Sequence, residues 1–167
     1  MQIRKFESKS TEVELRGIAV NDIEFKLIRE ELHLSQTELA ELWGVALRTL
    51  QRWEKGDFNI PKERQEKLYK MILDVYKSVQ NFLEVLNENT TDNKTTLVLL
   101  AYNQWTYDGD FPHYKIHYSS IAKCQSAAEK IGFKVRIVKF KPTEYTEWLA
   151  GRKDTQAMRS MWASLQV

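Results

Sequence analysis

The first half of the chain carries apolar residues at the spacing of amphipathic helices. Ile23, Leu27, Ile28 and Leu32 recur at intervals of three and four residues, which predicts a helix with one buried face. Upstream of this helix, apolar and polar residues alternate over 12–16, as in a half-exposed strand. The pattern therefore predicts an arm or edge strand followed by a helical segment.

Two further short helices are marked by their start and stop signals. Ser35 and Glu38 have the spacing of a capping box, in which each side chain satisfies a backbone amide of the other residue. Gly44 permits the sharp turn that ends this second helix. A third short helix is expected over 46–55, and Gly56 ends it.

A long fourth helix follows Pro61, which stands at a first-turn position where its missing N–H is not needed. Its apolar stripe continues for about seven turns. The stripe consists of Leu68, Met71, Ile72, Val75, Tyr76, Val79, Phe82, Leu83 and Leu86. This is longer than a four-helix module needs for its own core, so the surplus apolar face predicts a further partner, for which dimerisation is the natural use.

The second half has a mixed pattern after a polar linker at 89–96. The expected elements are strands over 97–102 and 133–141, a helix over 119–130, and short helices that begin near Thr143 and Asp154. This order predicts a small α+β part with helices on one face of its sheet. Val138 breaks the alternation of the second strand, which leaves open a bulge or burial on both faces.

Composition narrows the class of protein. Of 167 residues, 43% are hydrophobic and 29% charged, which excludes disordered and fibrous classes. The single cysteine, Cys124, excludes a disulfide within the chain. The longest apolar run, 97–101, is too short to span a bilayer, and the first ten residues lack the apolar core of a signal peptide. A soluble, cytoplasmic protein without a membrane partner is expected.

Charge is distributed unevenly although the net charge is only +2. Residues 22–43 contain two basic and six acidic side chains, whereas residues 48–70 contain seven basic and four acidic ones. If these segments lie on opposite faces, the molecule can approach a polyanion from one side only.

Three short motifs carry a resemblance to a known family. They are LSQTELA at 34–40, GV at 44–45 and LQRWEKG at 50–56. At this spacing the chain resembles the Cro/repressor-type (XRE-like) helix-turn-helix family over roughly residues 22–70. The physical chemistry agrees, because Ala40 is small where two helices cross closely and a glycine supplies the turn between them.

The resemblance implies DNA binding by the third helix. Its exposed face is expected to read bases through Leu47, Arg48, Gln51 and Arg52. Arginine can pair bidentately with guanine, and leucine can contact the methyl group of thymine. The expected phosphate-contacting residues are Gln36, Thr49, Lys55, Lys62 and Arg64. The family also pairs the positions of Arg29 and Glu54, an ion pair assigned to structure. Ala46 and Leu47 depart from the polar residues common at their positions.

The whole chain is therefore predicted to be mainly α with a small α+β part. The expected organisation is an arm or edge strand at 1–20, a four-to-five-helix helix-turn-helix domain with an extended last helix at 21–88, a linker at 89–96, and an α+β dimerisation or interaction domain at 97–167. This layout resembles some phage and mobile-element regulators, including anti-CRISPR-associated ones, and the segment 111–117 is similar to theirs.

Other chemistry in the second half is less favoured. A metal site could combine His113 and His117 with Asp108, Asp110 and Cys124, but the spacing matches no zinc pattern and ordinary surface histidines are favoured. Cys124 is expected to be buried and inert. Core packing is favoured over a ligand pocket for Trp105, Tyr107, Tyr145, Trp148 and Trp162, and a solvated sheet face over nucleic-acid contact for Lys134, Arg136, Lys139 and Lys141.

The leading hypothesis is a sequence-specific transcriptional regulator, a homodimeric repressor that reads palindromic operators in the major groove of double-stranded DNA. One alternative is an antitoxin whose C-terminal half binds a toxin, so a protein partner of that half stays open. A second is a sensor whose C-terminal half binds a small molecule or metal. No catalytic constellation is present in the pattern, and no enzyme activity, cofactor or bound metal is expected.

Overall fold

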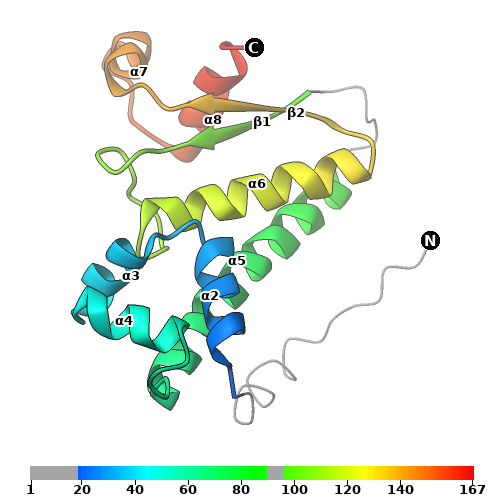
Figure 1. The fold of residues 1–167 in the computed structure, drawn as a ribbon. Coiled ribbons are helices and arrows are strands. Elements are labelled where there is room, and N and C mark those ends of the chain that lie inside the picture. Colours follow the sequence, from blue (N-terminus) through cyan, green and yellow to red (C-terminus); the bar gives the residue numbers. More distant parts are fainter. Residues whose placement is uncertain (1–18, 90–95) are drawn as a thin grey trace.

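The computed structural model describes residues 19–89 and 96–167 (Figure 1). The predicted arm and most of the predicted linker lie outside these ranges. The described elements are the helices α2 (Asp22–Glu31), α3 (Gln36–Trp43), α4 (Leu47–Glu54), α5 (Lys62–Asn89), α6 (Tyr114–Lys130), α7 (Pro142–Leu149) and α8 (Gln156–Ser164), and the strands β1 (Thr96–Ala101) and β2 (Lys134–Lys139). The prediction of a mainly α protein with a small α+β part is confirmed.

The first helices begin and end at the predicted signals. Asn21 caps α2 and Ser35 caps α3, each in a complete capping box with the residue three positions later. Gly44 ends α3 in the left-handed conformation at φ 63°, which favours glycine. Ala46 stands before α4 without a side-chain capping bond. Local signals therefore account for the starts and stops of the first helices.

The inward face of α2 differs from the prediction. Ile23 and Leu27 are 64% and 57% exposed, whereas Phe25, Arg29 and Leu32 are buried. The buried residues also follow helical spacing, but one of them is a charged arginine whose charge is matched by a partner in α4. The prediction was right for Leu32 and for the partly buried Ile28, which packs on the core, and wrong for Ile23 and Leu27. A pattern based on apolar residues alone treats position 29 as exposed.

The N-terminal helices α2–α4 and the first half of α5 are called the head here. The core of the head surrounds Phe25. Its ring packs edge-to-face with the rings of Trp43 and Trp53, and the ring centres lie 5.9 and 6.2 Å away. Aromatic pairs in such edge-to-face geometry gain energy beyond the area they bury. The same cluster includes Leu32, Leu34, Leu39, Ala40, Leu50, Ile60, Leu68, Met71, Ile72 and Val75.

The second half of α5 is covered by the same chain. Phe82, Leu83 and Leu86 pack with Ala128 of α6 and with Leu97 and Val135 of the strands. The sequence predicted that this surplus apolar face would be used for dimerisation. That prediction was wrong, because α6 and the strands of the same chain cover the face. Tyr76 is an exception within the stripe, since it is half exposed and its hydroxyl donates to Glu31.

The sheet has helices on both faces, not on one. Strands β1 and β2 pair in parallel without a bulge, from Thr96 opposite Lys134 to Ala101 opposite Lys139, and α6 forms the crossover between them. Val135 packs toward α5 and α6, whereas Val138 packs with the cluster of α7 and α8. Val138 breaks the alternation because both faces of the strand are covered.

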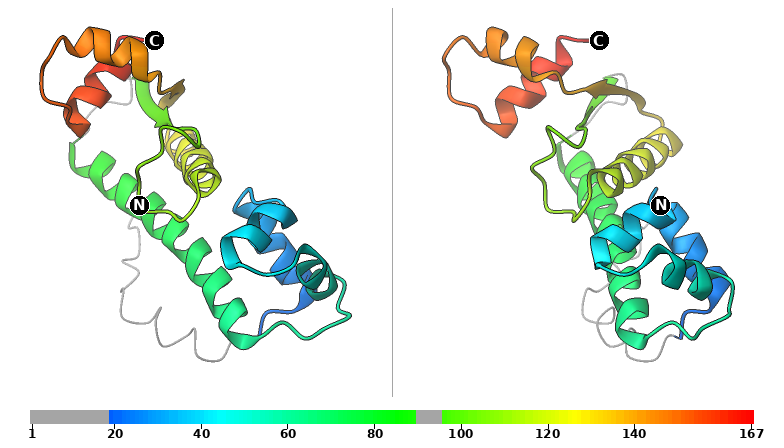
Figure 2. Two further views of the ribbon diagram at one scale, coloured as in Figure 1. Left: turned by 90° about the vertical axis from the view of Figure 1, so that its left-hand side faces the viewer. Right: turned by 60° about the vertical axis from the view of Figure 1, so that its left-hand side comes forward.

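Helix α6 connects the head to the sheet (Figure 2). It begins at Tyr114, five residues earlier than expected, because the His113 side chain caps its first turn by accepting from the amide of Lys115 at 3.3 Å. Ile116 is fully buried in the head core. The Ser119 hydroxyl donates to the backbone carbonyl of Glu31 at 2.6 Å. These contacts dock α6 onto the end of α2.

Two ion pairs reinforce this docking. Lys115 lies 2.7 Å from Glu38 of α3, and Lys123 lies 2.8 Å from Glu31 of α2. Helix α6 therefore belongs to the predicted C-terminal part and also packs against the head.

Within 19–89 and 96–167, no helix is long and apolar enough to cross a membrane.

Candidate nucleic-acid interface

Helix α4 presents one face to solvent because its other face is fixed in the core. Leu50 and Trp53 are buried there. The outward positions Leu47 and Arg48 are exposed, and Arg52 is partly exposed one turn beyond Arg48. The structure thus leaves the predicted base-reading side chains accessible on one side of α4.

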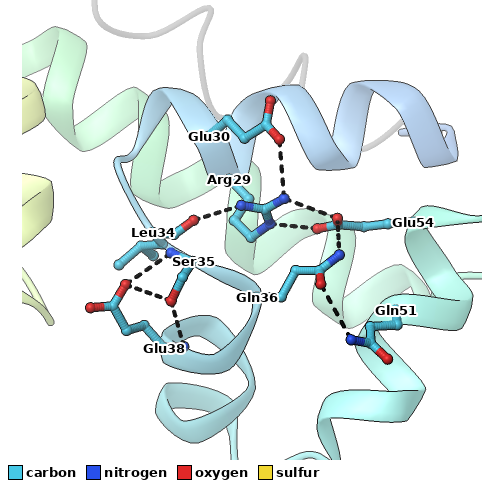
Figure 3. Close-up of polar contacts among 8 residues, drawn as sticks. All are labelled: Arg29, Glu30, Leu34, Ser35, Gln36, Glu38, Gln51 and Glu54. Atoms are coloured by element: carbon cyan, nitrogen blue, oxygen red, sulfur yellow. Dashed lines mark hydrogen bonds and ion pairs between the residues drawn. The ribbon is translucent and has the colours of Figure 1, made fainter.

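A buried ion pair holds α4 against α2 (Figure 3). The guanidinium of Arg29 donates to both carboxylate oxygens of Glu54, at 2.5 and 2.9 Å, and to the carbonyl of Leu34 at 2.6 Å. Burial disfavours the charged guanidinium, but the hydrogen bond and charge of Glu54 outweigh this and raise the pKa of Arg29. The structural role predicted for this pair is confirmed.

The same carboxylate positions two glutamines. The side-chain amide of Gln36 donates to Glu54 at 2.8 Å, and the amide of Gln51 reaches the Gln36 oxygen at 3.5 Å (Figure 3). Two predicted DNA-contacting residues from different helices are therefore brought together. Their amides are held by the protein in this arrangement, so Gln51 is less free than an isolated base reader.

A hollow beside these glutamines is lined by a residue that the sequence analysis did not place at the interface. Its lining comprises Lys26, Gln36, Gln51, Glu54 and Lys55. Lys26 belongs to α2, outside the motifs of the resemblance, and only the packing of α2 on α4 brings it to this side. Its exposed position on a helix was the only signal in the sequence.

Arg52 has an aromatic neighbour that was also missed. Its guanidinium carbon lies 4.7 Å from the centre of the Phe58 ring, in the segment between α4 and α5. Phe58 is 49% exposed. An arginine above an aromatic face gains cation–π attraction. The side chain of Arg52 is thus packed against an aromatic ring, whereas that of Arg48 is not.

The other predicted phosphate contacts lie in different surroundings. Thr49 is half-buried on α4, and Lys55 is exposed at its end. Lys62 is exposed at the start of α5, with its amine 3.7 Å from Glu66. Arg64 is half-buried, with its guanidinium 5.5 Å from the centre of a Trp43 ring. Packing thus accounts for part of the position of Arg64.

The residues of the imagined metal site have other partners. His113 caps α6, and the ring of His117 contacts the carbonyl of Leu100 at 3.2 Å. Burial lowers the pKa of both histidines. Asp108 pairs with Arg159 at 3.1 Å. Among the described residues there is no group of three or more histidine, cysteine or acidic side chains that could hold a metal.

Cys124 is buried on α6, and burial raises the pKa of its thiol. This position agrees with the prediction for the cysteine. Nearby, α5, α6, α8 and the segment after β1 surround a cleft of about 470 Å³, whose lining includes Asp74, Tyr107, His117 and Arg159.

The aromatic residues and basic strand of the second half have two different environments. Tyr145 and Trp162 are buried in one cluster with Tyr107 and Trp148 packed around it, as predicted. Trp105 is 84% exposed, so core packing was the wrong expectation for it; the turn formed with Asn103 directs it outward. Lys134, Arg136, Lys139 and Lys141 are all exposed.

Comparison with known proteins identifies a family. A family described as Aca2/YdiL-like matches residues 20–131, about two thirds of the chain. The family consists of anti-CRISPR-associated regulators of the helix-turn-helix type, which bind DNA. This supports the predicted likeness to mobile-element regulators and does not single out the Cro/XRE type. No curated protein matches the chain.

Proposed function

The chain belongs to the Aca2/YdiL-like family, and from this membership we propose that it is a homodimeric repressor that reads palindromic operators in the major groove. The observation that carries the proposal is the outward face of α4, where Leu47 and Arg48 are exposed and Arg52 lies one turn away. The buried Arg29–Glu54 pair supports it, because a reading helix must be held at a fixed angle to its neighbours.

Base reading in this proposal belongs to the two arginines. Each can pair through two N–H groups with the O6 and N7 atoms of a guanine. Leu47, at the start of α4, can contact a thymine methyl group. Each good bidentate pair contributes about 1–3 kcal/mol of discrimination against the wrong base. Two guanines in each half-site are therefore expected.

Phosphate contacts in the proposal surround the reading face. Gln36 stands in the first turn of α3, where backbone N–H groups point outward and the helix dipole favours an anion. Lys26 and Lys55 line the hollow next to it, and Lys62 is exposed at the start of α5. Such contacts position the protein on the duplex and make the affinity depend on salt.

Dimerisation is assigned to the C-terminal part. Since the stripe of α5 is covered by α6, the remaining exposed apolar side chains are the better candidates, and Met161 and Leu165 lie one turn apart at the end of α8. Two heads joined by two-fold symmetry would place their α4 helices in successive major grooves, about 34 Å apart.

The first experiment selects binding sites from random duplexes and then measures affinity for the selected and a scrambled site across salt concentrations. Arg48→Ala and Arg52→Ala are each expected to weaken binding to the selected site by about tenfold or more, with a smaller loss on scrambled DNA. Arg136→Ala, on the exposed side of β2, is the matched control. Equal losses on both DNAs, or no selected site, would contradict base reading.

A second experiment tests the dimer and the repression. Light scattering of the wild type should give the mass of two chains, and Met161→Glu with Leu165→Glu should shift it toward one. A promoter carrying the selected site should be silenced by the wild type and not by Arg48→Ala/Arg52→Ala. A monomeric wild type, or an unrepressed promoter together with a stably co-purifying protein, would contradict the proposal and favour the antitoxin alternative.

A further inference from the structure

Phe58 is an exposed aromatic side chain on the side of the molecule that carries the candidate interface. Nearly half of its surface is open to solvent, although it lies in a short polar segment between two helices. The head core does not include it. Its close neighbour is the guanidinium of Arg52, 4.7 Å from the ring centre. Its position is therefore better explained by this arginine than by core packing.

The backbone after α4 brings the ring to this place. The amides of Asp57 and Phe58 both donate to the carbonyl of Arg52, at 3.0 and 3.4 Å. Gly56 makes the reversal possible with φ +74°, and a Cβ there would lie 3.2 Å from a carboxylate oxygen of Asp22. Phe58 is thus anchored to the same residue whose side chain it supports.

Arg48 provides an internal comparison. It stands one turn before Arg52 on α4 and is exposed. Among the described residues its side chain makes no hydrogen bond, ion pair or ring contact. The two arginines therefore differ in their side-chain contacts and in their exposure, because the side chain of Arg52 lies over a ring and that of Arg48 does not.

We propose that Phe58 is the positioning residue for Arg52 and sets how strongly the protein discriminates at the base pair that Arg52 reads. A guanidinium that stacks on a ring by its flat face keeps the N–H groups along its edge, and these are the groups that pair with guanine. Holding the side chain before binding reduces the rotamer entropy that is lost in the complex. The inference rests on the proposed base reading by α4.

The test combines protein variants with operator variants. Phe58→Ala is expected to weaken binding to the selected operator about 2- to 5-fold, the effect of one exposed cation–π contact. The loss should appear at the base pair that Arg52→Ala identifies and not at the pair that Arg48→Ala identifies. Phe58→Tyr should restore wild-type discrimination because it keeps the ring, whereas Phe58→Leu should not.

A double-mutant cycle separates positioning from direct DNA contact. In the Arg52→Ala background, Phe58→Ala should cause no further loss, while in the Arg48→Ala background it should cause its full loss. Affinity for scrambled DNA and the melting temperature serve as checks that the head stays folded. An additional loss in the Arg52→Ala background, or full rescue by Phe58→Leu, would overturn the inference.

The cycle also distinguishes two kinds of failure. If Arg52→Ala lowers discrimination and Phe58→Ala does not, the positioning role is refuted and base reading stands. If Arg52→Ala leaves discrimination unchanged at every base pair, base reading by this arginine fails and the positioning role fails with it.

Discussion

The head and the C-terminal part each use one arginine to join elements that are distant in the sequence, but the surroundings of the two arginines differ. Arg29 binds Glu54, of whose side chain only 3% is exposed. Arg159 binds Asp108 and Asp154, whose side chains are 65% and 44% exposed. The hydrogen bonds of Asp154 raise the pKa of Arg159, which burial alone would lower.

This difference indicates how each region is held together. In the head, loss of Glu54 would leave the buried guanidinium of Arg29 with only a longer contact of 3.4 Å to the half-exposed Glu30, so the pair with Glu54 fixes α4 against α2. In the C-terminal part, water can replace the exposed carboxylates. There the guanidinium of Arg159 lies over the ring of Phe140, and the buried rings of Tyr145 and Trp162 form the core beneath it. Both regions have an aromatic core, but only the head adds a buried ion pair to it.

The largest effect is expected from breaking the buried pair. Glu54→Ala should lower the free energy of unfolding by about 3–5 kcal/mol, because it removes the buried partner of Arg29 and leaves only the longer contact to Glu30 at 3.4 Å. Urea unfolding followed by circular dichroism measures this change. Glu66→Ala is the control, since its pair with Lys62 is exposed and should contribute less than about 1 kcal/mol. Equal costs for the two variants would contradict the distinction between buried and exposed pairs.

The next effect concerns the helix that joins the two regions. Ile116→Ala should lower the free energy of unfolding by about 2–5 kcal/mol, because the side chain is fully buried in the head core although it belongs to α6. Tryptophan fluorescence and circular dichroism should shift together. Ile137→Ala, at a half-exposed position on β2, is the control with a smaller loss. Two separate transitions would show that the regions unfold independently.

A smaller effect is expected from acid. The amine of Lys115 and the groups of Ser35 outweigh the effect of burial and lower the pKa of Glu38 to about 2, from 4.5. Because the folded pKa lies below the unfolded one, this stabilisation is fully present above about pH 4.5 and is lost as the pH falls toward 2. Glu38→Gln keeps a capping side chain and removes the charge. The difference in unfolding free energy between wild type and variant should therefore shrink between pH 5 and pH 3, and a constant difference would contradict this.

The smallest effect is expected in the C-terminal part. Asp108→Asn should change the free energy of unfolding by less than about 1 kcal/mol, because the carboxylate is mostly exposed and Arg159 keeps its bond to Asp154. Urea unfolding at low and high salt should give the same small difference or a smaller one. A loss as large as that of Glu54→Ala would remove the contrast between the two arginines.

Features that depend on neighbouring residues could be predicted from the sequence. The capping box of Ser35, the turn at Gly44 and the start of the long helix after Pro61 all depend on backbone groups within a few positions. The outward face of α4 followed in the same way, since Leu50 and Trp53 already marked the inward one. The pairing of Arg29 with Glu54 came from the family resemblance and was confirmed.

Other features were decided only where distant segments meet. Which face of α2 is buried depended on a carboxylate 25 residues away that made burial of Arg29 favourable. The second covered face of the sheet depended on α7 and α8, and the cover of the α5 stripe depended on α6. Sequence periodicity gives the spacing of the side chains that face inward. Which neighbours those side chains contact in the core follows from tertiary packing. For this reason the local elements and the outward face of α4 were determined by the sequence itself, whereas the buried face of α2 and the partners of Arg52 and Ile116 were decided by the tertiary structure.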